Sequence, residues 1–237
     1  MTTLRHNALT HVGRVRKVNE DSILALPDQK IWVVADGMGG HAGGDFASQT
    51  VVYSVAMIPL DLEPAERMQA LRGAIQNAHQ TILTEIEARG GAVIGSAVVA
   101  MMVAGEHFVA FWAGDCRLYR LREDKIEMLT SDHSIVADYV HAGEMTWDEA
   151  ELHPQSNAIT RAVGVGDELE LEKIRGTLQV GDRFLLCSDG LNKYAGFETL
   201  RRAMVGVPLE TVSDKLMNIA LTGGGADNIS VIVVDVK

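Results

Sequence analysis

The sequence predicts an α+β fold, in which helices and antiparallel strands occupy separate blocks of the chain. Short apolar runs separated by turn residues fill residues 92–129, a pattern typical of antiparallel strands. Apolar residues at near-helical spacing mark a long helix over residues 64–89, and further helices are predicted near 197–204 and 209–220. Strands and helices do not alternate regularly along the chain, so a parallel βαβ fold is disfavoured.

Two of these elements have clear boundaries in the sequence. Residues 30–35 are an apolar run rich in strand-forming residues and are followed by Asp36-Gly37, which predicts a buried strand leading into a sharp turn. The helix predicted over 64–89 has Pro64 in its first turn and Gly90-Gly91 after its end, as helix termini often do.

The remaining elements follow from similar local patterns. Turn residues divide the central block into strands that we expect to form an antiparallel meander, at 92–103, 107–113, 117–121 and 126–129. The other predicted elements are helices at 46–58, 134–142 and 146–152, and strands at 168–174, 184–187 and 229–236.

Composition excludes several classes of protein. The 237 residues are 47% hydrophobic, which is enough for a sizeable core, and nothing resembles a linker or repeat, so one domain over 1–237 is predicted. A net charge of -11 and the lack of a basic run argue against nucleic-acid binding. No apolar run approaches the ~20 residues that span a bilayer, and no signal-peptide core is present. We therefore expect a cytoplasmic, monomeric protein without a membrane span.

Carboxylates recur at the ends of the predicted strands. Asp36, Asp115 and Asp189 each follow an apolar run, Asp227 precedes the last one, and Glu20-Asp21 precedes the run 22–26. One such Asp is usually a turn or cap residue, but several buried at strand ends need a positive partner. Oxygen ligands without His or Cys select Mg²⁺ or Mn²⁺, and paired ions of this kind suit phosphate esters. The sequence thus predicts an acidic metal site.

Short motifs that follow one another in a fixed order between residues 13 and 230 support this prediction. They are Gly13-x-Val15-Arg16-x-x-Asn19-Glu20-Asp21, Val34-Ala35-Asp36-Gly37-Met38-Gly39-Gly40-His41, Gly114-Asp115-Cys116-Arg117, Leu129-Thr130-x-Asp132-His133-Ser134, Ile159-Thr160-Arg161-Ala162-Val163-Gly164, Gly181-Asp182-x-Phe184-Leu185-Leu186-Cys187-Ser188-Asp189-Gly190-Leu191 and Asp227-Asn228-Ile229-Ser230. Any one motif is weak, but the ordered set resembles the type 2C protein phosphatases, the metal-dependent Ser/Thr phosphatases, in their compact bacterial form.

The resemblance implies a four-layer α-β-β-α sandwich, two stacked antiparallel sheets flanked by helices, with a metal centre at one end. It implies two Mn²⁺ or Mg²⁺ ions, with Asp36 bridging them and the Gly37 carbonyl as a further ligand. The other ligands that it implies are Asp189 and Asp227 for one metal, Asp21 and Glu20 acting partly through water, and Asp115 for a weaker third ion.

Two residues outside the metal ligands acquire catalytic roles from the resemblance. Arg16 matches the phosphate-binding arginine, whose planar guanidinium can hold two phosphate oxygens at once. His41 matches a proposed general acid that protonates the leaving oxygen of serine or threonine. The implied reaction is direct attack on phosphorus by a metal-activated water, with no phosphoenzyme.

This chain departs from the family pattern at two places, neither of which is an implied ligand. Gly95-Ser96-Ala97 stands where the family often has Gly-Thr-Thr, and Cys116 replaces the Ser of Gly-Asp-Ser-Arg. The segment over about 135–155 corresponds to the family's mobile and variable flap, where we expect substrate choice to lie.

Two other motifs point to different chemistry. The glycines at 37–43 follow a strand and precede a helix like a dinucleotide fingerprint, but no second strand with an acidic end follows at the required distance. Cys116 and Arg122 have the C-x₅-R spacing of cysteine phosphatases, but the residues between them alternate like a strand and include no glycine. Both matches are therefore interpreted as coincidental.

The sequence and the resemblance together predict a protein-serine/threonine phosphatase. Its partners would be phosphorylated proteins and a cognate Ser/Thr kinase, and regulation of type VI secretion is one context in which compact bacterial members act. The alternative from another class is a pseudophosphatase, a regulatory binding module on the same fold. We disfavour it because Arg16 and every implied carboxylate ligand are present.

Overall fold

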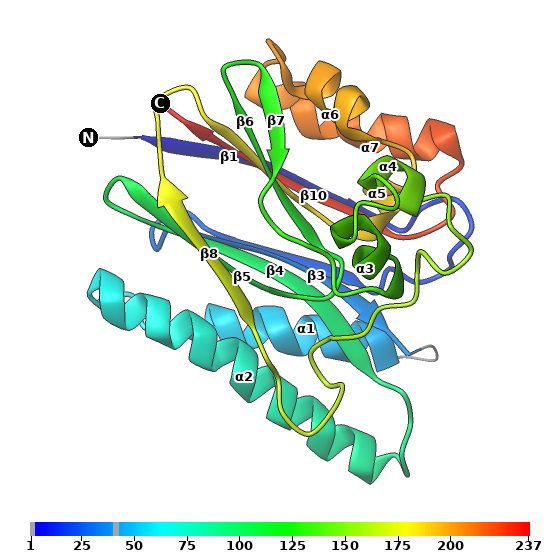
Figure 1. The fold of residues 1–237 in the computed structure, drawn as a ribbon. Helices are drawn as coiled ribbons and strands as arrows, with labels where there is room; N and C mark the ends of the chain where they lie inside the picture. Colours follow the sequence, from blue (N-terminus) through cyan, green and yellow to red (C-terminus); the bar gives the residue numbers. More distant parts are fainter. Residues whose placement is uncertain (1–2, 40–42) are drawn as a thin grey trace.

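Two five-stranded antiparallel sheets stack face to face (Figure 1). The computed structural model describes residues 3–39 and 43–237. The first sheet, named here the β10 sheet, contains in spatial order β1 (Leu4–His11), β10 (Ile229–Val236), β9 (Arg183–Cys187), β6 (Arg117–Arg122) and β7 (Lys125–Met128). The second, the β3 sheet, contains β2 (Asp21–Leu26), β3 (Ile31–Met38), β4 (Gly95–Ala104), β5 (His107–Ala113) and β8 (Glu172–Thr177).

Helices cover the outer face of each sheet, which gives the predicted α-β-β-α order of layers. The β3 sheet is covered by α1 (Gly43–Ala56) and α2 (Pro64–Ala88). The β10 sheet is covered by α6 (Phe197–Met204) and α7 (Leu209–Gly223), with the short α5 (Asp189–Asn192) directly after β9. The predicted fold class is confirmed.

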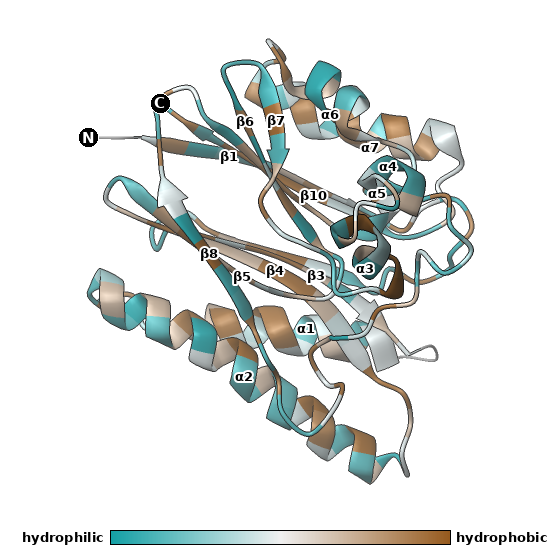
Figure 2. Ribbon diagram, viewed as in Figure 1, coloured by the Kyte–Doolittle hydropathy of each residue, from teal (hydrophilic) through white to brown (hydrophobic). Residues whose placement is uncertain are grey.

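Apolar side chains fill the space between the layers. The ribbon in Figure 2 shows hydrophobic residues recurring along the inner strands. In β3, Val33 and Ala35 pack against the helices, whereas Trp32 and Val34 pack between the sheets. Both faces of this strand are buried, so its sequence is a continuous apolar run rather than an alternation. This strand, which is buried from Ile31 to Ala35, carries Asp36 near its end.

The predicted meander is wrong at one point. The chain leaves the β3 sheet after β5 and enters the β10 sheet at β6, which pairs with β7 and β9 and not with β5. Local turn signals at Gly114-Asp115 predict a reversal but do not say whether the next strand returns to the same sheet. The consequence is that Asp115 lies where the chain crosses between the sheets.

Two strands differ from the sequence prediction. β1 was not predicted, because its polar residues obscure the apolar pattern, and it is specified by pairing with β10 from Leu4↔Val236 to His11↔Ile229. β8 begins at Glu172, later than the predicted strand at 168–174, and it pairs with β5 at the edge of the sheet. In both cases tertiary pairing determined the element.

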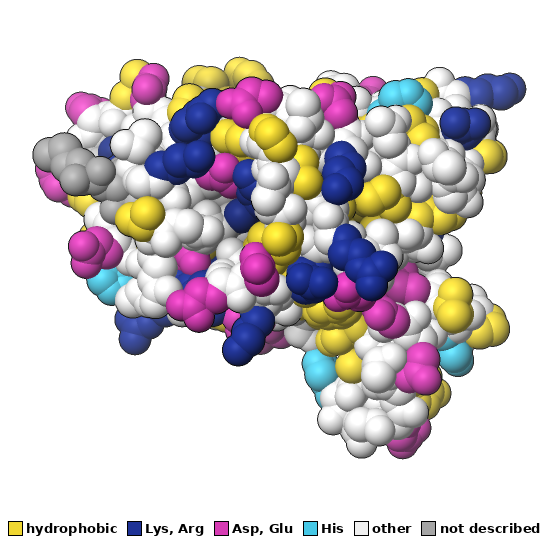
Figure 3. Space-filling model, turned by 90° about the horizontal axis from the view of Figure 1, so that it is seen from above, with side chains coloured by type: hydrophobic (Ala, Val, Ile, Leu, Met, Phe, Trp, Pro, Cys, Tyr) yellow, Lys and Arg dark blue, Asp and Glu magenta, His cyan; other side chains and the backbone are white. Residues whose placement is uncertain are grey.

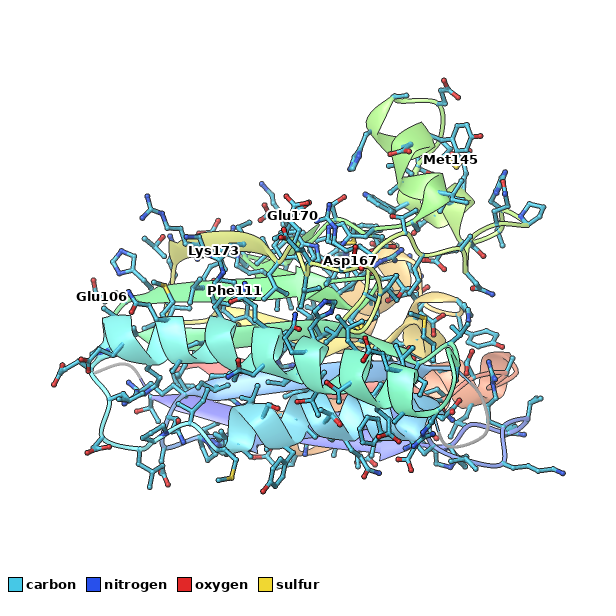
Figure 4. The ribbon with its side chains drawn as sticks, turned by 90° about the horizontal axis from the view of Figure 1, so that it is seen from below. Glu106, Phe111, Met145, Asp167, Glu170 and Lys173 are labelled. Carbon is cyan, nitrogen blue, oxygen red and sulfur yellow. The ribbon has the colours of Figure 1, made fainter. Side chains whose placement is uncertain are left out.

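The flap contains α3 (Ile135–His141) and α4 (Trp147–Ala150), close to the predicted short helices. Figure 4 shows this segment, marked by Met145, standing out from the body of the molecule at the upper right. In Figure 3, which is seen from the opposite direction, a lobe projects at the lower right. On the face seen in Figure 3, basic and acidic side chains are intermingled. Within residues 3–39 and 43–237, no helix has both the length and the apolar character needed to cross a membrane.

Candidate metal centre and active site

The first pair of carboxylates at the site comes from neighbouring strands of the β3 sheet. Asp21 begins β2 and lies directly opposite Asp36 of β3 in the antiparallel register. Like charges in directly opposite positions repel each other, so this pairing is unfavourable unless a cation or a proton intervenes. Asp21 is buried, and its Oδ2 accepts a hydrogen bond of 2.7 Å from the Ser188 hydroxyl.

The second pair comes from the β10 sheet. Asp189 follows β9 and Asp227 precedes β10, and these strands are antiparallel neighbours, so both residues lie at the same end of the sheet. Lys193, one helical turn after Asp189, places its Nζ 2.7 Å from Asp189 Oδ2 and 3.4 Å from Asp227 Oδ2. Arg16 Nη2 lies 2.9 Å from the same Asp227 oxygen.

Asp36, Asp189 and Asp227 line one cavity of about 250 Å³ between the ends of the two sheets. Asp115 enters it from the crossover between β5 and β6. The residues that line the cavity are Arg16, Glu20, Asp36, Gly37, Met38, Gly39, Ala97, Asp115, Asn157, Ile159, Asp189, Lys193, Asp227 and Asn228. All the predicted site residues except Asp21 and His41 are among them. Asp21 lies opposite Asp36 in the β3 sheet.

Close backbone contacts bring the segments together. A side chain on Gly37 would meet the Gly44 and Glu20 carbonyl oxygens, and one on Gly190 would meet the Asn228 carbonyl oxygen, so these two positions require glycine. At Gly37, close packing of the backbone therefore accounts for the glycine.

Asn228 joins the loop before β2 to the site, a role that sequence reasoning missed. Its Nδ2 donates to the carbonyl oxygens of Val12 and Val18, both at 2.9 Å, and its Oδ1 accepts from the Glu20 amide at 2.8 Å. The loop that carries Arg16 and Glu20 is thus held beside Asp227.

Burial and mutual repulsion dominate the electrostatics of the site. Burial raises the pKa of Asp21 to about 7, although the hydrogen bond from Ser188 lowers it. Burial, reinforced by the charges of neighbouring carboxylates, raises the pKa of Asp36 and of Asp115 well above the usual range. Burial opposes the charge on Lys193, but Asp189 and Asp227 outweigh this effect and raise its pKa.

The donor set fits a divalent cation. As the side chains stand, no three His, Cys, Asp or Glu residues in the described part of the chain converge closely enough to coordinate one ion. However, Asp21 Oδ1 is buried and lacks any hydrogen-bond partner among the described residues, which is costly for a carboxylate. Lys193 contacts Asp189 and Arg16 contacts Asp227, so these two cations partly offset the carboxylate charge at the site. Oxygen ligands of this kind favour Mg²⁺ or Mn²⁺.

Comparisons with known proteins identify the family. The family model described as Protein phosphatase 2C matches residues 11–222. The chain belongs to the protein phosphatase 2C family. It is 35% identical to the serine/threonine protein phosphatase PstP of Mycobacterium tuberculosis over 234 residues, which are 98% of this chain and 45% of that protein. The chain therefore spans a little under half the length of this curated relative.

Solved structures agree with this assignment. PppA, a key regulatory component of T6SS in Pseudomonas aeruginosa, is 40% identical, with a TM-score of 0.91 and coverage of 100% of both chains. The catalytic domain of PstP in complex with two manganese ions is 33% identical, with a TM-score of 0.90 and coverage of 100% of this chain and 99% of that one. The predictions of a metal-dependent Ser/Thr protein phosphatase family and fold are confirmed.

Within this protein phosphatase 2C domain, one of the two predicted catalytic residues, Arg16, lies at the cavity. Arg16 lies at the mouth of the cavity with half of its side chain exposed, where a phosphate could reach it. His41 lies outside the described residues, so its role as a general acid stays a prediction.

Cys116 has none of the features of a nucleophile. It is buried, and burial together with the charges of Asp36 and Asp115 raises the pKa of its thiol well above the usual range. The residues that follow it form strand β6 and not a phosphate-binding loop. The C-x₅-R spacing to Arg122 is coincidental, since Arg122 binds Asp182 instead.

Lys193 is a site residue that sequence reasoning missed. A signal was available, because Lys193 stands four residues after Asp189 and a lysine at that spacing on a helix reaches back to the carboxylate. The sequence does not show, however, that the same ammonium also contacts Asp227 of a distant strand.

Proposed function

We propose that residues 1–237 form a single catalytic domain that hydrolyses phosphoserine and phosphothreonine in proteins with the help of two Mn²⁺ or Mg²⁺ ions. The observation that carries this proposal is the meeting of carboxylates from both sheets around one cavity. Asp21, which lies opposite Asp36 in the β3 sheet, adds a buried Oδ1 without a described hydrogen-bond partner. An arrangement of this kind is costly for a folded protein unless cations are bound.

Asp36 is proposed to bridge the two ions, with the Gly37 carbonyl as a further ligand and with Asp189 and Asp227 holding one ion. Glu20 and Asp21 are proposed to act partly through water, and Asp115 to hold a weaker third ion. Bound cations would neutralise the phosphate and lower the pKa of a water molecule beside it.

The remaining residues are assigned to the substrate. Arg16 is proposed to hold two phosphate oxygens at the mouth of the cavity. Its ion pair with Asp227 orients the guanidinium for this role. His41 is proposed as the acid that protonates the leaving oxygen, on the resemblance alone. Lys193 limits the repulsion between Asp189 and Asp227.

Phosphoproteins opposing a Ser/Thr kinase are the proposed substrates, and regulation of a type VI secretion system is the proposed setting. Support comes from PppA, to which this chain is 40% identical over its full length. The kinase itself, the cytoplasmic location and the monomeric state stay predictions. Comparing phosphoproteomes of cells with and without the enzyme would identify the substrates.

Activity measurements on the purified protein separate the proposal from its alternatives. Hydrolysis of a phosphothreonine peptide should require Mn²⁺ and should be abolished by a chelator, whereas Cys116→Ala should retain most of the activity. Loss of activity in Cys116→Ala with insensitivity to chelation would support a cysteine phosphatase. Failure of the Mn²⁺-loaded protein to hydrolyse phosphopeptide or p-nitrophenyl phosphate would support a pseudophosphatase.

A further inference from the structure

A buried arginine next to the site has its hydrogen-bonding groups occupied by three different side chains. Arg117 begins β6 and is 4% exposed. Its Nε lies 2.9 Å and its Nη2 2.6 Å from the two oxygens of Asp132, and its Nη1 donates to the Tyr119 hydroxyl at 3.1 Å. The remaining interaction of Nη2 is with Glu151 Oε1, at 2.6 Å.

Glu151 belongs to the flap, immediately after α4. Its side chain is 15% exposed, so the ion pair with Arg117 is largely shielded from water. At the other end of α4, the Trp147 ring lies 5.3 Å from the Arg117 guanidinium carbon. Among the residues that the structure describes, Glu151–Arg117 is the only ion pair joining the flap, residues 135–155, to the rest of the chain. We name this ion pair the flap anchor.

The flap anchor borders the active-site cavity. Arg117, Glu151, Asp115, Asp189 and Asn157 line one crevice beneath the flap, and Asn157 also lines the active-site cavity. Asn157 and Ile159 follow the flap in the chain and form the edge of that cavity nearest to it. The flap projects from the body (Figure 4). Besides the flap anchor, its side chains join the body through His141 Nε2, 2.8 Å from Ser131 Oγ, and through Asp148 Oδ1, which accepts from the Phe197 amide at 3.3 Å. Of these contacts, only the flap anchor lies in the crevice next to the cavity, so a change there would displace this edge.

We infer that Glu151 is a positioning residue, which fixes the flap on Arg117 and thereby fixes the cavity edge at Asn157 and Ile159 for the binding of protein substrates. This inference rests on the proposed phosphatase function. A phosphoprotein is large enough to contact the flap and this edge, whereas p-nitrophenyl phosphate needs only the part of the cavity formed by Arg16 and the carboxylates. Loosening the flap anchor should therefore weaken binding of the large substrate and leave the small one unaffected.

Glu151→Gln tests this inference, and Glu144→Gln is its matched control. Glu144 is an exposed flap glutamate, and no hydrogen bond or ion pair of its side chain is recorded within the described part of the chain. Glu151→Gln should raise KM for a phosphoprotein by about tenfold, which is the effect of losing roughly 1.4 kcal/mol of binding. It should change kcat/KM for p-nitrophenyl phosphate less than about twofold, and Glu151→Asp should restore part of the KM.

Limited proteolysis measures the flap directly. The flap has aromatic residues at Tyr139 and Trp147, so chymotrypsin should cleave Glu151→Gln there roughly tenfold faster than wild type and cleave Glu144→Gln at the wild-type rate. Unchanged proteolysis would overturn the inference, as would equal loss of activity on both substrates. If wild type hydrolyses neither substrate, the proposed phosphatase function fails, whereas the proteolysis still decides whether the flap anchor exists.

Discussion

Two buried aspartates at one end of the sandwich are each bound by an arginine, whereas the facing pair Asp21 and Asp36 at the other end is not. At the end remote from the cavity, Asp182 precedes β9 and Asp235 lies near the end of β10, and both are buried. Arg122 binds the two oxygens of Asp182 at 2.6 and 2.7 Å, and Arg183 binds those of Asp235 at 2.6 and 2.8 Å. At the cavity end, Asp21 and Asp36 face each other and no arginine binds either carboxylate in the described part of the chain.

This difference shows how burial and pairing together separate a structural carboxylate from a functional one. A buried carboxylate with a two-pronged arginine has its charge compensated within the protein, and its removal affects folding. A buried carboxylate that faces other carboxylates keeps its oxygens available for an external cation, at a cost in stability. Substitutions at the cavity end should therefore lower activity, and substitutions at the other end should lower stability.

The largest effect is expected from Asp36→Asn. Loss of the bridging carboxylate should lower kcat/KM by roughly 10³-fold or more and should abolish tight Mn²⁺ binding. In the absence of metal, the same change removes one of several repelling carboxylates, so the melting temperature should stay constant or rise. Enzyme assays, calorimetric Mn²⁺ titration and thermal melts with a chelator measure these effects. An active variant that binds metal normally would contradict the bridging role.

Asp235→Asn should have the opposite effect at the other end. It leaves Arg183, whose side chain is 11% exposed, without its carboxylate. Breaking a buried pair typically costs about 3–5 kcal/mol, which would lower the melting temperature by roughly 6–20 °C. Activity per folded molecule should be unchanged, because Asp235 is remote from the cavity. Asp214→Asn, at an exposed position on α7, is the control and should change neither quantity. A normal melting temperature in Asp235→Asn would show that the ion pair is not stabilising.

The contrast between the two ends could not be predicted from the sequence. Asp182 and Asp189 lie close to opposite ends of the apolar strand β9. The local sequence therefore does not show which of the two carboxylates is structural and which is functional. What separates them is Arg122, 60 residues away from Asp182 along the chain, which reaches it only through the pairing of β6 with β9. Tertiary contacts therefore decide which carboxylate is bound by an arginine.

Local patterns were sufficient for most of the fold. The strands over Phe108, Phe184 and Ile232 were predicted because apolar and β-branched residues dominate each run, and α2 because its apolar residues recur at helical spacing. The resemblance supplied the two-sheet architecture. Sheet membership after β5 was predicted wrongly, because a turn sequence at Gly114 specifies a change of direction and not the neighbouring strand.

The smallest of the three effects concerns pH. Burial raises the pKa of Asp21 to about 7, and those of Asp36 and Asp115 are also raised, so between about pH 4 and 7 the metal-free folded chain binds protons that the unfolded chain has lost. This stabilisation is complete below about pH 4 and is lost as the pH rises through about 7.

The metal-free protein should therefore melt at a lower temperature at about pH 8 than at about pH 5, by roughly 4–8 °C for a difference of about 2 kcal/mol. Saturating Mn²⁺ should stabilise the protein more at the higher pH, because a cation binds the ionised carboxylates. Thermal melts with a chelator and with Mn²⁺ measure both trends, and the chelator series should be flatter in Asp36→Asn. If the melting temperature of the metal-free protein rises with pH equally in wild type and in Asp36→Asn, burial and mutual repulsion do not raise the pKa values of the cavity carboxylates.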